Sequence, residues 1–442
     1  MRSLDAYLND RKIGTLSEGD DLWRFCYEPS WVDAPDGFDL SPALPRSEPL
    51  QQDGGSQRPV QWYFDNLLPE ETLREAVSKE AQIKGDDAFA LLEYLGAESA
   101  GSLVLLPPGQ AMPVRGEKRA LSDADLCLRI QNLPQATLSS GAPKRISAAG
   151  AQHKLLVIYQ DGALFEPVGA EPSTHILKPN HLSDDYAASA INEYITMKLA
   201  RAMLGTVPEV YRRYTPKPVY IVARFDRYAD EQGLTQRRHI IDACQLLNKA
   251  RSFKYKSASV ATLADIVARC RNRASTRMRL FSWLVFNVLI GNDDCHLKNL
   301  SFLVSPDGIE LAPFYDLLST ACYHTRALAN ERATWPAVNM MIPLPNARRF
   351  GEVTRASILE AGEALGLPHR VSERELNRLM ADLMKALPTL VAEIEAENQG
   401  LAEAVRPYLG GELRLVRTLL HVVVPEMLGR MKTSSIRPTN PP

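Results

Sequence analysis

The chain has 442 residues, of which 45% are hydrophobic and 24% charged, with a formal net charge of −2. This length predicts two or three domains with a sizeable core, and the near-neutral charge excludes a general attraction to nucleic acid, so any such contact would need a local basic patch. Six scattered cysteines without a CxxC pair indicate free thiols, and no signal peptide or apolar stretch of roughly 18 residues is present, so we expect a cytoplasmic protein without membrane contact.

Residues 1–110 are expected to form an N-terminal α+β module. A stretch rich in Pro, Gly, Asp and Ser, residues 33–59, is expected to be an irregular loop with at most one short strand. Apolar residues recur at helical spacing after Pro69. Strands are predicted over Leu22–Tyr27 and Leu103–Leu106, and helices over 70–83 and 87–95.

Two further regions follow this module. Residues 111–228 are predicted to form a β-rich lobe, strand-rich from residue 146 on, with one strong helix over 186–204. Residues 229–431 are predicted to be mostly helical, and the polar, proline-rich tail 432–442 is expected to be disordered. A small β-rich lobe followed by a large helical lobe is the architecture of protein kinases, an α+β fold in which the nucleotide lies between the lobes.

A run of small residues precedes the predicted strand 155–159. Small side chains let backbone N–H groups approach a phosphate closely, and such loops bind anions. The run is neither a Walker loop nor a complete GxGxxG, so a plain turn is the alternative. The candidate nucleotide-binding residues here are Ser147, Ala149, Gly150, Ala151, Gln152 and Lys154.

A lysine and a glutamate downstream fit the same nucleotide site. Lys178 ends the predicted strand His-Ile-Leu-Lys and could bridge nucleotide phosphates. Glu193, within the predicted helix, could hold Lys178 by an ion pair. The alternatives are a solvated surface lysine and an exposed helix carboxylate.

An apolar strand breaks into a polar turn just before the helical lobe, where a hinge between the lobes is expected. The backbone groups of Ala223 and Phe225 could then meet the adenine edge. Arg224 and Asp226 either stabilise the structure locally or tie the hinge to the catalytic loop. A separate cluster, Arg269, Arg271, Arg273, Arg277 and Arg279, is either a solvated helix face or a patch that steers an acidic or nucleic-acid-bound substrate.

The segment from Asp294 to Asn299 carries the strongest chemical signal. It follows a buried apolar helix over 281–290 that ends at Gly291, and a hairpin with strands 300–304 and 309–312 leads from it to Asp316. An aspartate, four residues and an asparagine is the spacing of a kinase catalytic loop, with a metal-binding aspartate one hairpin later. A carboxylate orients the attacking hydroxyl, and oxygen ligands from two loops hold Mg²⁺. The alternative is that Asp293 and Asp294 only cap a turn.

Taken together, these motifs resemble those of the HipA toxins of bacterial type II toxin–antitoxin systems. The resemblance covers most of the chain, from the N-terminal module to about residue 390, and its specificity lies in the combination of motifs. The matching segments are YFDNLLP at 63–69, SAAGAQHK at 147–154, HILK at 175–178, NEY at 192–194, RFD at 224–226, IGNDDCHLKN at 290–299 and PFYD at 313–316.

The resemblance implies a serine/threonine protein kinase that uses ATP and Mg²⁺. By this resemblance, Asp294 orients the substrate hydroxyl, Asn299 and Asp316 hold Mg²⁺, and Lys178 contacts the phosphates. Ser147 matches an autophosphorylation site whose modification displaces the loop and inactivates the kinase. The ATP-binding set implied in this way also includes His296 and Lys298, with His296 expected to act as a scaffold of the loop.

The resemblance also implies partners. The family target is an aminoacyl-tRNA synthetase, best known as the glutamyl enzyme, whose phosphorylation arrests growth. A small helix-turn-helix antitoxin, HipB-like, binds the toxin, and operator DNA is contacted only through that complex. This chain departs from the family pattern with Ala223 in place of a hinge acid, His153 in place of an acidic residue and a longer Pro/Gly-rich loop. Two alternatives stay open: a small-molecule kinase of similar fold, or a catalytically silent antitoxin-binding corepressor.

Overall fold

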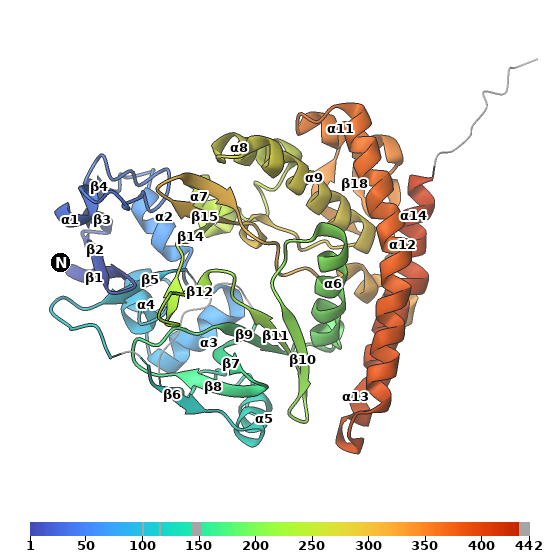
Figure 1. The fold of residues 1–442 in the computed structure, drawn as a ribbon, viewed down its shortest axis with the longest axis horizontal. Helices are drawn as coiled ribbons and strands as arrows, with labels where there is room; N and C mark the ends of the chain where they lie inside the picture. The colour runs from blue at the N-terminus through green and yellow to red at the C-terminus, as the bar shows by residue number, and fades with distance from the viewer. Residues whose placement is uncertain (100, 115, 144–151, 433–442) are drawn as a thin grey trace, which may run out of the picture.

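The computed structural model describes residues 1–99, 101–114, 116–143 and 152–432. Two antiparallel sheets and their short helices lie on one side of the molecule, and a group of longer helices lies on the other (Figure 1). Within the described ranges, no helix combines the length and the apolar character needed to cross a membrane.

The N-terminal module is a five-stranded sheet in the order β4-β3-β2-β1-β5 with short helices packed against it. Its second helix was not predicted, because it spans only seven residues and begins at a proline. The Asp53 carboxylate accepts hydrogen bonds from the N–H groups of Val60 and Gln61 and so caps this helix from outside the segment. The elements are β1 (Arg2–Leu8), β2 (Arg11–Gly19), β3 (Leu22–Tyr27), α1 (Pro29–Val32), β4 (Leu50–Gln52), α2 (Pro59–Asp65), α3 (Glu71–Ala81), α4 (Ala88–Leu95) and β5 (Leu103–Leu106).

The middle of the chain forms a six-stranded antiparallel sheet in the order β10-β11-β9-β7-β8-β6. A small apolar core of its own includes Leu126, Leu155 and Ile221. The sheet's elements are β6 (Lys118–Ala120), β7 (Leu155–Gln160), β8 (Ala163–Pro167), β9 (His175–Pro179), β10 (Val210–Tyr214) and β11 (Pro218–Ala223), with helices α5 (Asp123–Gln131) and α6 (Ser189–Leu204).

Short strands connect this sheet to the helical lobe. The predicted hairpin is present, and β14 extends it to three strands in the order β14-β15-β16. A further hairpin, β17–β18, was not predicted, since the region after residue 241 was expected to be helical apart from one hairpin. The bounds are β12 (Arg227–Ala229), β13 (Thr235–Arg237), β14 (Ile240–Asp242), α7 (Ala243–Leu246), β15 (Ser301–Ser305), β16 (Gly308–Leu311), β17 (Asn339–Leu344) and β18 (Ala347–Arg349).

Helix α9 is the central helix of the large lobe. Every residue from 280 to 290 on it is buried, which explains the long apolar run, and it ends at Gly291 with φ +66°. A Cβ on Gly291 would lie 2.4 Å from that of Ala321, so the turn into the next loop requires glycine. The lobe's helices are α8 (Val260–Arg269), α9 (Arg273–Ile290), α10 (Arg326–Ala329), α11 (Arg355–Ala364), α12 (His369–Gln399), α13 (Arg406–Thr418) and α14 (Val424–Met431).

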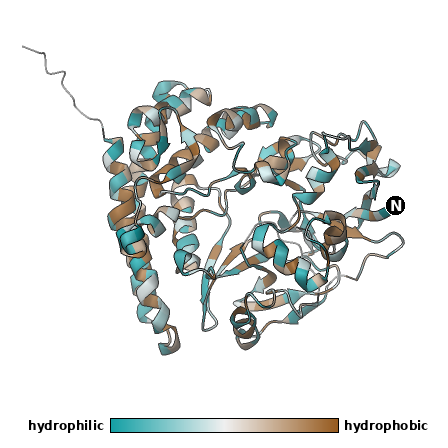
Figure 2. Ribbon diagram, turned by 180° about the vertical axis from the view of Figure 1, so that it is seen from behind, coloured by the Kyte–Doolittle hydropathy of each residue, from teal (hydrophilic) through white to brown (hydrophobic). Residues whose placement is uncertain are grey.

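One continuous apolar core joins the large lobe to the N-terminal module. The long helix α12 carries hydrophobic and hydrophilic residues side by side along its length (Figure 2), and its buried positions recur every three or four residues. The arginine cluster divides between two roles. Arg269, Arg271 and Arg273 are exposed, whereas Arg279 donates to the carbonyl oxygens of Leu311 and Ala312, both at 2.7 Å, and so fixes the hairpin that leads to Asp316.

Candidate active site

The loop after α9 is shaped by buried polar groups. The side-chain oxygen of Asn292 accepts the Asp294 N–H at 3.0 Å, while its amide donates to Asn287 at 2.7 Å. The Asp293 N–H donates to the Thr320 hydroxyl at 2.7 Å. On the other side of Asp294, its carbonyl oxygen accepts the His296 N–H at 2.8 Å. The turn that carries the Asp294 carboxylate is therefore hydrogen-bonded on both sides of this residue. Sequence reasoning missed Asn292 and Thr320; the only local signal was the asparagine directly after the glycine that ends the helix.

Asn299 contacts Asp294, and the charge of Asp316 acts on Asp294, so the two ends of the hairpin lie near each other. The amide nitrogen of Asn299 donates to the Asp294 carbonyl oxygen at 2.9 Å, which turns its amide oxygen away from that carbonyl. Asp316 has φ +58°, a left-handed conformation that a non-glycine residue adopts at a cost. Strain of this kind is typical of functional sites, and here it sets the direction of the Asp316 carboxylate.

Asp294 has the electrostatics of a weak base near neutral pH. Burial, together with the carboxylates of Asp316 and Asp293, raises the pKa of Asp294 to about 7. The side chain is nevertheless 47% exposed, so a hydroxyl from solvent can reach it. A carboxylate that titrates near pH 7 and remains accessible can accept a proton during catalysis.

Lys178 joins the two lobes of the site. Its ammonium lies 2.7 Å from Glu193 on α6, and it also forms an ion pair with Asp316. The predicted ion pair between Lys178 and Glu193 is therefore present. Burial disfavours the charged form of Asp316, but Lys178 outweighs it and lowers the pKa of Asp316 to about 2. Asp316 is thus ionised at neutral pH.

His296 is a neutral part of the loop scaffold. Its imidazole packs edge-on against Tyr255 with ring centroids 5.1 Å apart, and its Nε2 lies 4.0 Å from Asp294. Burial and the nearby Lys254 ammonium lower the pKa of His296 to about 4. The uncharged ring can shape the space beside Asp294 without neutralising its charge.

The small-residue loop is described only at its end. Ser147, Ala149, Gly150 and Ala151 lie outside the described residues. Gln152 donates to the Pro179 carbonyl oxygen at 3.3 Å. Burial and the Lys178 charge lower the pKa of Lys154 to about 8, so the two lysines are near enough to influence each other.

The hinge differs in part from the expectation. The Ala223 N–H already donates to the Glu209 carbonyl oxygen at 2.9 Å, so an adenine ring could use this donor only by displacing it. The Phe225 ring lies against Tyr315, the residue before Asp316, with ring centroids 5.5 Å apart.

Arg224 and Asp226 form a buried pair at 2.7 Å, and Arg224 also approaches Glu98 of the N-terminal module at 3.5 Å. Both contacts fit the structural alternative for these two residues. Their part in ATP binding stays a prediction.

Lys298 also departs from the expectation of a nucleotide contact. Its ammonium lies 2.8 and 2.9 Å from the two oxygens of Asn66, 2.7 Å from Asp242 and 3.3 Å from Glu70. The side chain is buried, so the ammonium is enclosed by these oxygens. In this structure it contacts the N-terminal module, and its predicted contact with ATP stays a prediction.

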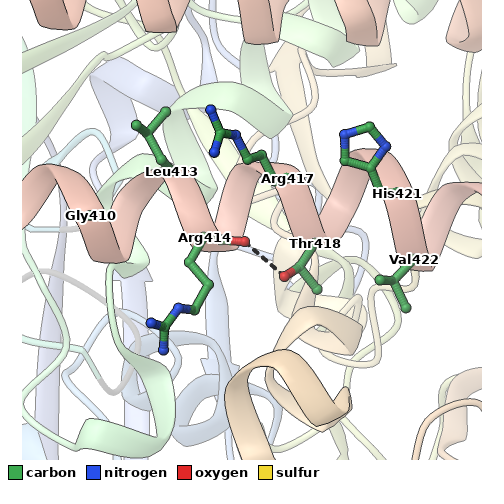
Figure 3. Close-up of a pocket in the computed structure, with 7 residues that line it drawn as sticks. All are labelled: Gly410, Leu413, Arg414, Arg417, Thr418, His421 and Val422. Carbon is green, nitrogen blue, oxygen red and sulfur yellow. Dashed lines mark hydrogen bonds between the residues drawn. The ribbon is translucent and has the colours of Figure 1, made fainter.

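The described structure also has an open pocket along α13 and the helical turn that follows it (Figure 3). None of the predicted site residues lines it, so we assign it no part in the chemistry. Its lining residues are Gly410, Leu413, Arg414, Arg417, Thr418, His421 and Val422.

Known proteins resemble this chain over most of its length. Residues 4–106 match the HipA N-terminal domain, and residues 146–391 match the HipA-like C-terminal domain. The chain is 35% identical over 338 residues to a putative kinase, Y4mE, of Sinorhizobium fredii, which covers 73% of this chain and 78% of that protein. It is 32% identical over 346 residues to the serine/threonine-protein kinase toxin HipA of Shewanella oneidensis, with 73% and 76% covered.

A solved structure gives the same result for the fold. A chain from the complex of Shewanella oneidensis HipA, HipB and operator DNA superposes with a TM-score of 0.76 and 26% identity, covering 96% of this chain and 99% of that one. The α+β kinase fold expected from the sequence is thereby confirmed. The chain belongs to the HipA family of serine/threonine-protein kinase toxins.

Proposed function

We propose that the protein is an ATP-dependent serine/threonine protein kinase that acts as the toxin of a type II toxin–antitoxin module. The observation that carries this proposal is the convergence of Asp294, Asn299 and Asp316 with the Lys178–Glu193 pair. These groups supply a base, two oxygen ligands and a phosphate-binding cation. A silent binding module would not need a strained, ionised Asp316 beside a pKa-shifted Asp294.

In the proposed reaction, Asp294 orients a serine or threonine hydroxyl and accepts its proton. The hydroxyl oxygen forms a bond to the γ-phosphorus of ATP while the bond from that phosphorus to the β,γ-bridging oxygen breaks, and ADP leaves with the electron pair. Lys178, held by Glu193, binds the phosphates. Because the pKa of Asp294 is near 7, a large fraction of its carboxylate is ionised at neutral pH and can accept the proton of the hydroxyl.

The residues present fit a magnesium ion. Mg²⁺ prefers oxygen ligands, and the site offers the ionised carboxylate of Asp316 and the amide oxygen of Asn299, whose nitrogen is already bound to the Asp294 carbonyl. When bound, the ion would neutralise charge on the phosphates. In this structure Asp316 is paired with Lys178. With ATP and Mg²⁺ bound, the Asp316 carboxylate would serve the ion and the Lys178 ammonium would serve the phosphates.

We further propose that Ser147 is autophosphorylated and that this inactivates the kinase. Ser147 lies in the small-residue loop proposed to cover the nucleotide. A phosphate there would add a charge of about −2 where the nucleotide phosphates must bind. The Lys154 and Lys178 ammonium groups near the end of this loop would then be drawn to the loop instead of to ATP.

The proposed partners follow the family. The solved relative is a complex of HipA with HipB and operator DNA, which supports an antitoxin partner for this chain. We propose that this partner is a HipB-like helix-turn-helix protein and that operator DNA is contacted only through it. As protein target we propose an aminoacyl-tRNA synthetase, phosphorylated in the cytoplasm to arrest growth.

The test uses the purified full-length protein with γ-labelled ATP and Mg²⁺. The wild type is expected to label itself or a protein in a cell extract, whereas Asp294→Ala and Asp316→Ala should not. Equal labelling in all three proteins would overturn the proposal. Label found only in small molecules would point to the small-molecule kinase instead, and tight antitoxin binding without any label would point to the corepressor.

A further inference from the structure

The backbone and the side chain of Lys298 are held by different parts of the protein. It stands between Asp294 and Asn299 in the chain, directly before the proposed metal ligand. Its carbonyl oxygen accepts a hydrogen bond from the Tyr315 hydroxyl at 2.7 Å. Tyr315 directly precedes Asp316, so this bond connects the backbone of the catalytic loop to the segment that carries the second ligand.

The Lys298 side chain extends in the other direction, into the N-terminal module. Asn66 contributes both its backbone and its side-chain oxygen at 2.8 and 2.9 Å, and Glu70 lies at 3.3 Å. Both belong to the short segment between α2 and α3. The remaining contact, Asp242 at 2.7 Å, comes from the end of β14. Asn66, which is 232 positions away from Lys298 in the chain, thus contacts the catalytic loop directly.

A second lysine repeats this connection. Lys254 lies 2.5 Å from Glu70 and 3.0 Å from Glu71, and its carbonyl oxygen accepts the Leu297 N–H at 3.3 Å. The Glu70 carboxylate, almost fully buried, therefore lies between Lys298 of the catalytic loop and Lys254, whose backbone contacts that loop. A buried ammonium needs all of its partners, since each unpaired charge is costly away from water. The loop position consequently depends on the N-terminal module remaining in place.

We propose that Asn66 and Glu70 are positioning residues for phosphoryl transfer. They act through Lys298, whose ammonium they hold, and through it on the spacing between Asp294 and Asn299. The inference rests on the proposed kinase activity. It makes the N-terminal module a part of the catalytic apparatus, with catalysis weakened whenever this contact is loosened.

The test compares Asn66→Ala and Glu70→Gln with a matched control, Asp65→Asn, in the full-length protein. Asp65 also links the module to the large lobe, through Arg251 at 2.9 Å, but it does not contact Lys298. We expect kcat to fall at least tenfold in both test variants, with KM for ATP within twofold of wild type. The control should keep kcat within twofold.

Hydrogen exchange supplies a readout independent of activity. Exchange of the amides in residues 292–300, followed by mass spectrometry, should be at least tenfold faster in both test variants than in the control. Equal exchange in the test and control variants would overturn the inference, whether or not the wild type is active. An inactive wild type would refute the kinase proposal separately. Should Asn66→Ala fail to fold, Glu70→Gln, which keeps the size of the side chain, decides the question.

Discussion

The buried pair of Lys178 and Glu193 yields a prediction that can be worked out from its geometry. The two charged groups are 2.7 Å apart, and their side chains are only 9% and 3% exposed. Replacing Lys178 with methionine keeps the bulk but leaves Glu193 without its closest cation. Breaking a buried pair in this way typically costs about 3–5 kcal/mol, because the remaining charge is uncompensated.

The cost of Lys178→Met should depend on pH. Burial already raises the pKa of Glu193 above its usual range, and loss of Lys178 would raise it further. A carboxyl whose pKa is raised on folding binds more protons in the folded state, so its contribution to stability falls as pH rises above its unfolded pKa of about 4.3. The variant should therefore lose stability relative to wild type between pH 5.5 and 7.5, by up to about 1.4 kcal/mol per pH unit.

Urea unfolding followed by circular dichroism at pH 5.5 and 7.5 measures this effect. The double variant Lys178→Met with Glu193→Leu serves as the control, since it removes both charges of this pair and should recover the part of the loss that comes from Glu193. Asp316, the other partner of Lys178, loses its cation in both variants. A penalty for Lys178→Met below about 1 kcal/mol at both pH values, in the absence of any pH trend, would refute the reasoning.

Three further predictions concern the chemistry directly. Asp294→Ala should lower kcat by about 10²–10⁴-fold if the carboxylate acts as the proton acceptor, and Asp316→Ala should leave no measurable transfer, both read from γ-labelled ATP. Because the pKa of Asp294 is raised to about 7 in the free protein, kcat/KM should rise with pH through about 7 as the carboxylate ionises; a flat kcat/KM profile from pH 6 to 8 would argue against this role. Phosphopeptide mapping after incubation with ATP should find phosphate on Ser147, and Ser147→Ala should stay active longer; a map without that site removes the self-inactivation mechanism.

Local patterns were sufficient for the catalytic segment. The apolar run of α9, the glycine that ends it and the hairpin that follows are all encoded within about thirty residues, so the positions of Asp294, Asn299 and Asp316 could be predicted from spacing alone. The Lys178–Glu193 pair was also within reach, since a strand and the next helix place the two residues near one cleft.

Long-range contacts were beyond such reasoning. Lys298 was expected at the nucleotide because of its place in the motif. Its ammonium instead contacts oxygen acceptors on Asn66 and Glu70, and no local sequence pattern connects these residues to Lys298. Arg224 was likewise drawn to Glu98 of the N-terminal module. Helix α2 escaped prediction because seven residues give too little periodicity, and its cap comes from Asp53 outside the helix.

The central claim is that this chain phosphorylates a protein through Asp294. Quantitative phosphoproteomics of cells expressing either the wild type or Asp294→Ala at equal levels tests it most directly. The account predicts serine or threonine phosphosites, on an aminoacyl-tRNA synthetase and on Ser147, that appear with the wild type alone. Growth arrest with identical phosphoproteomes in the two strains would contradict it.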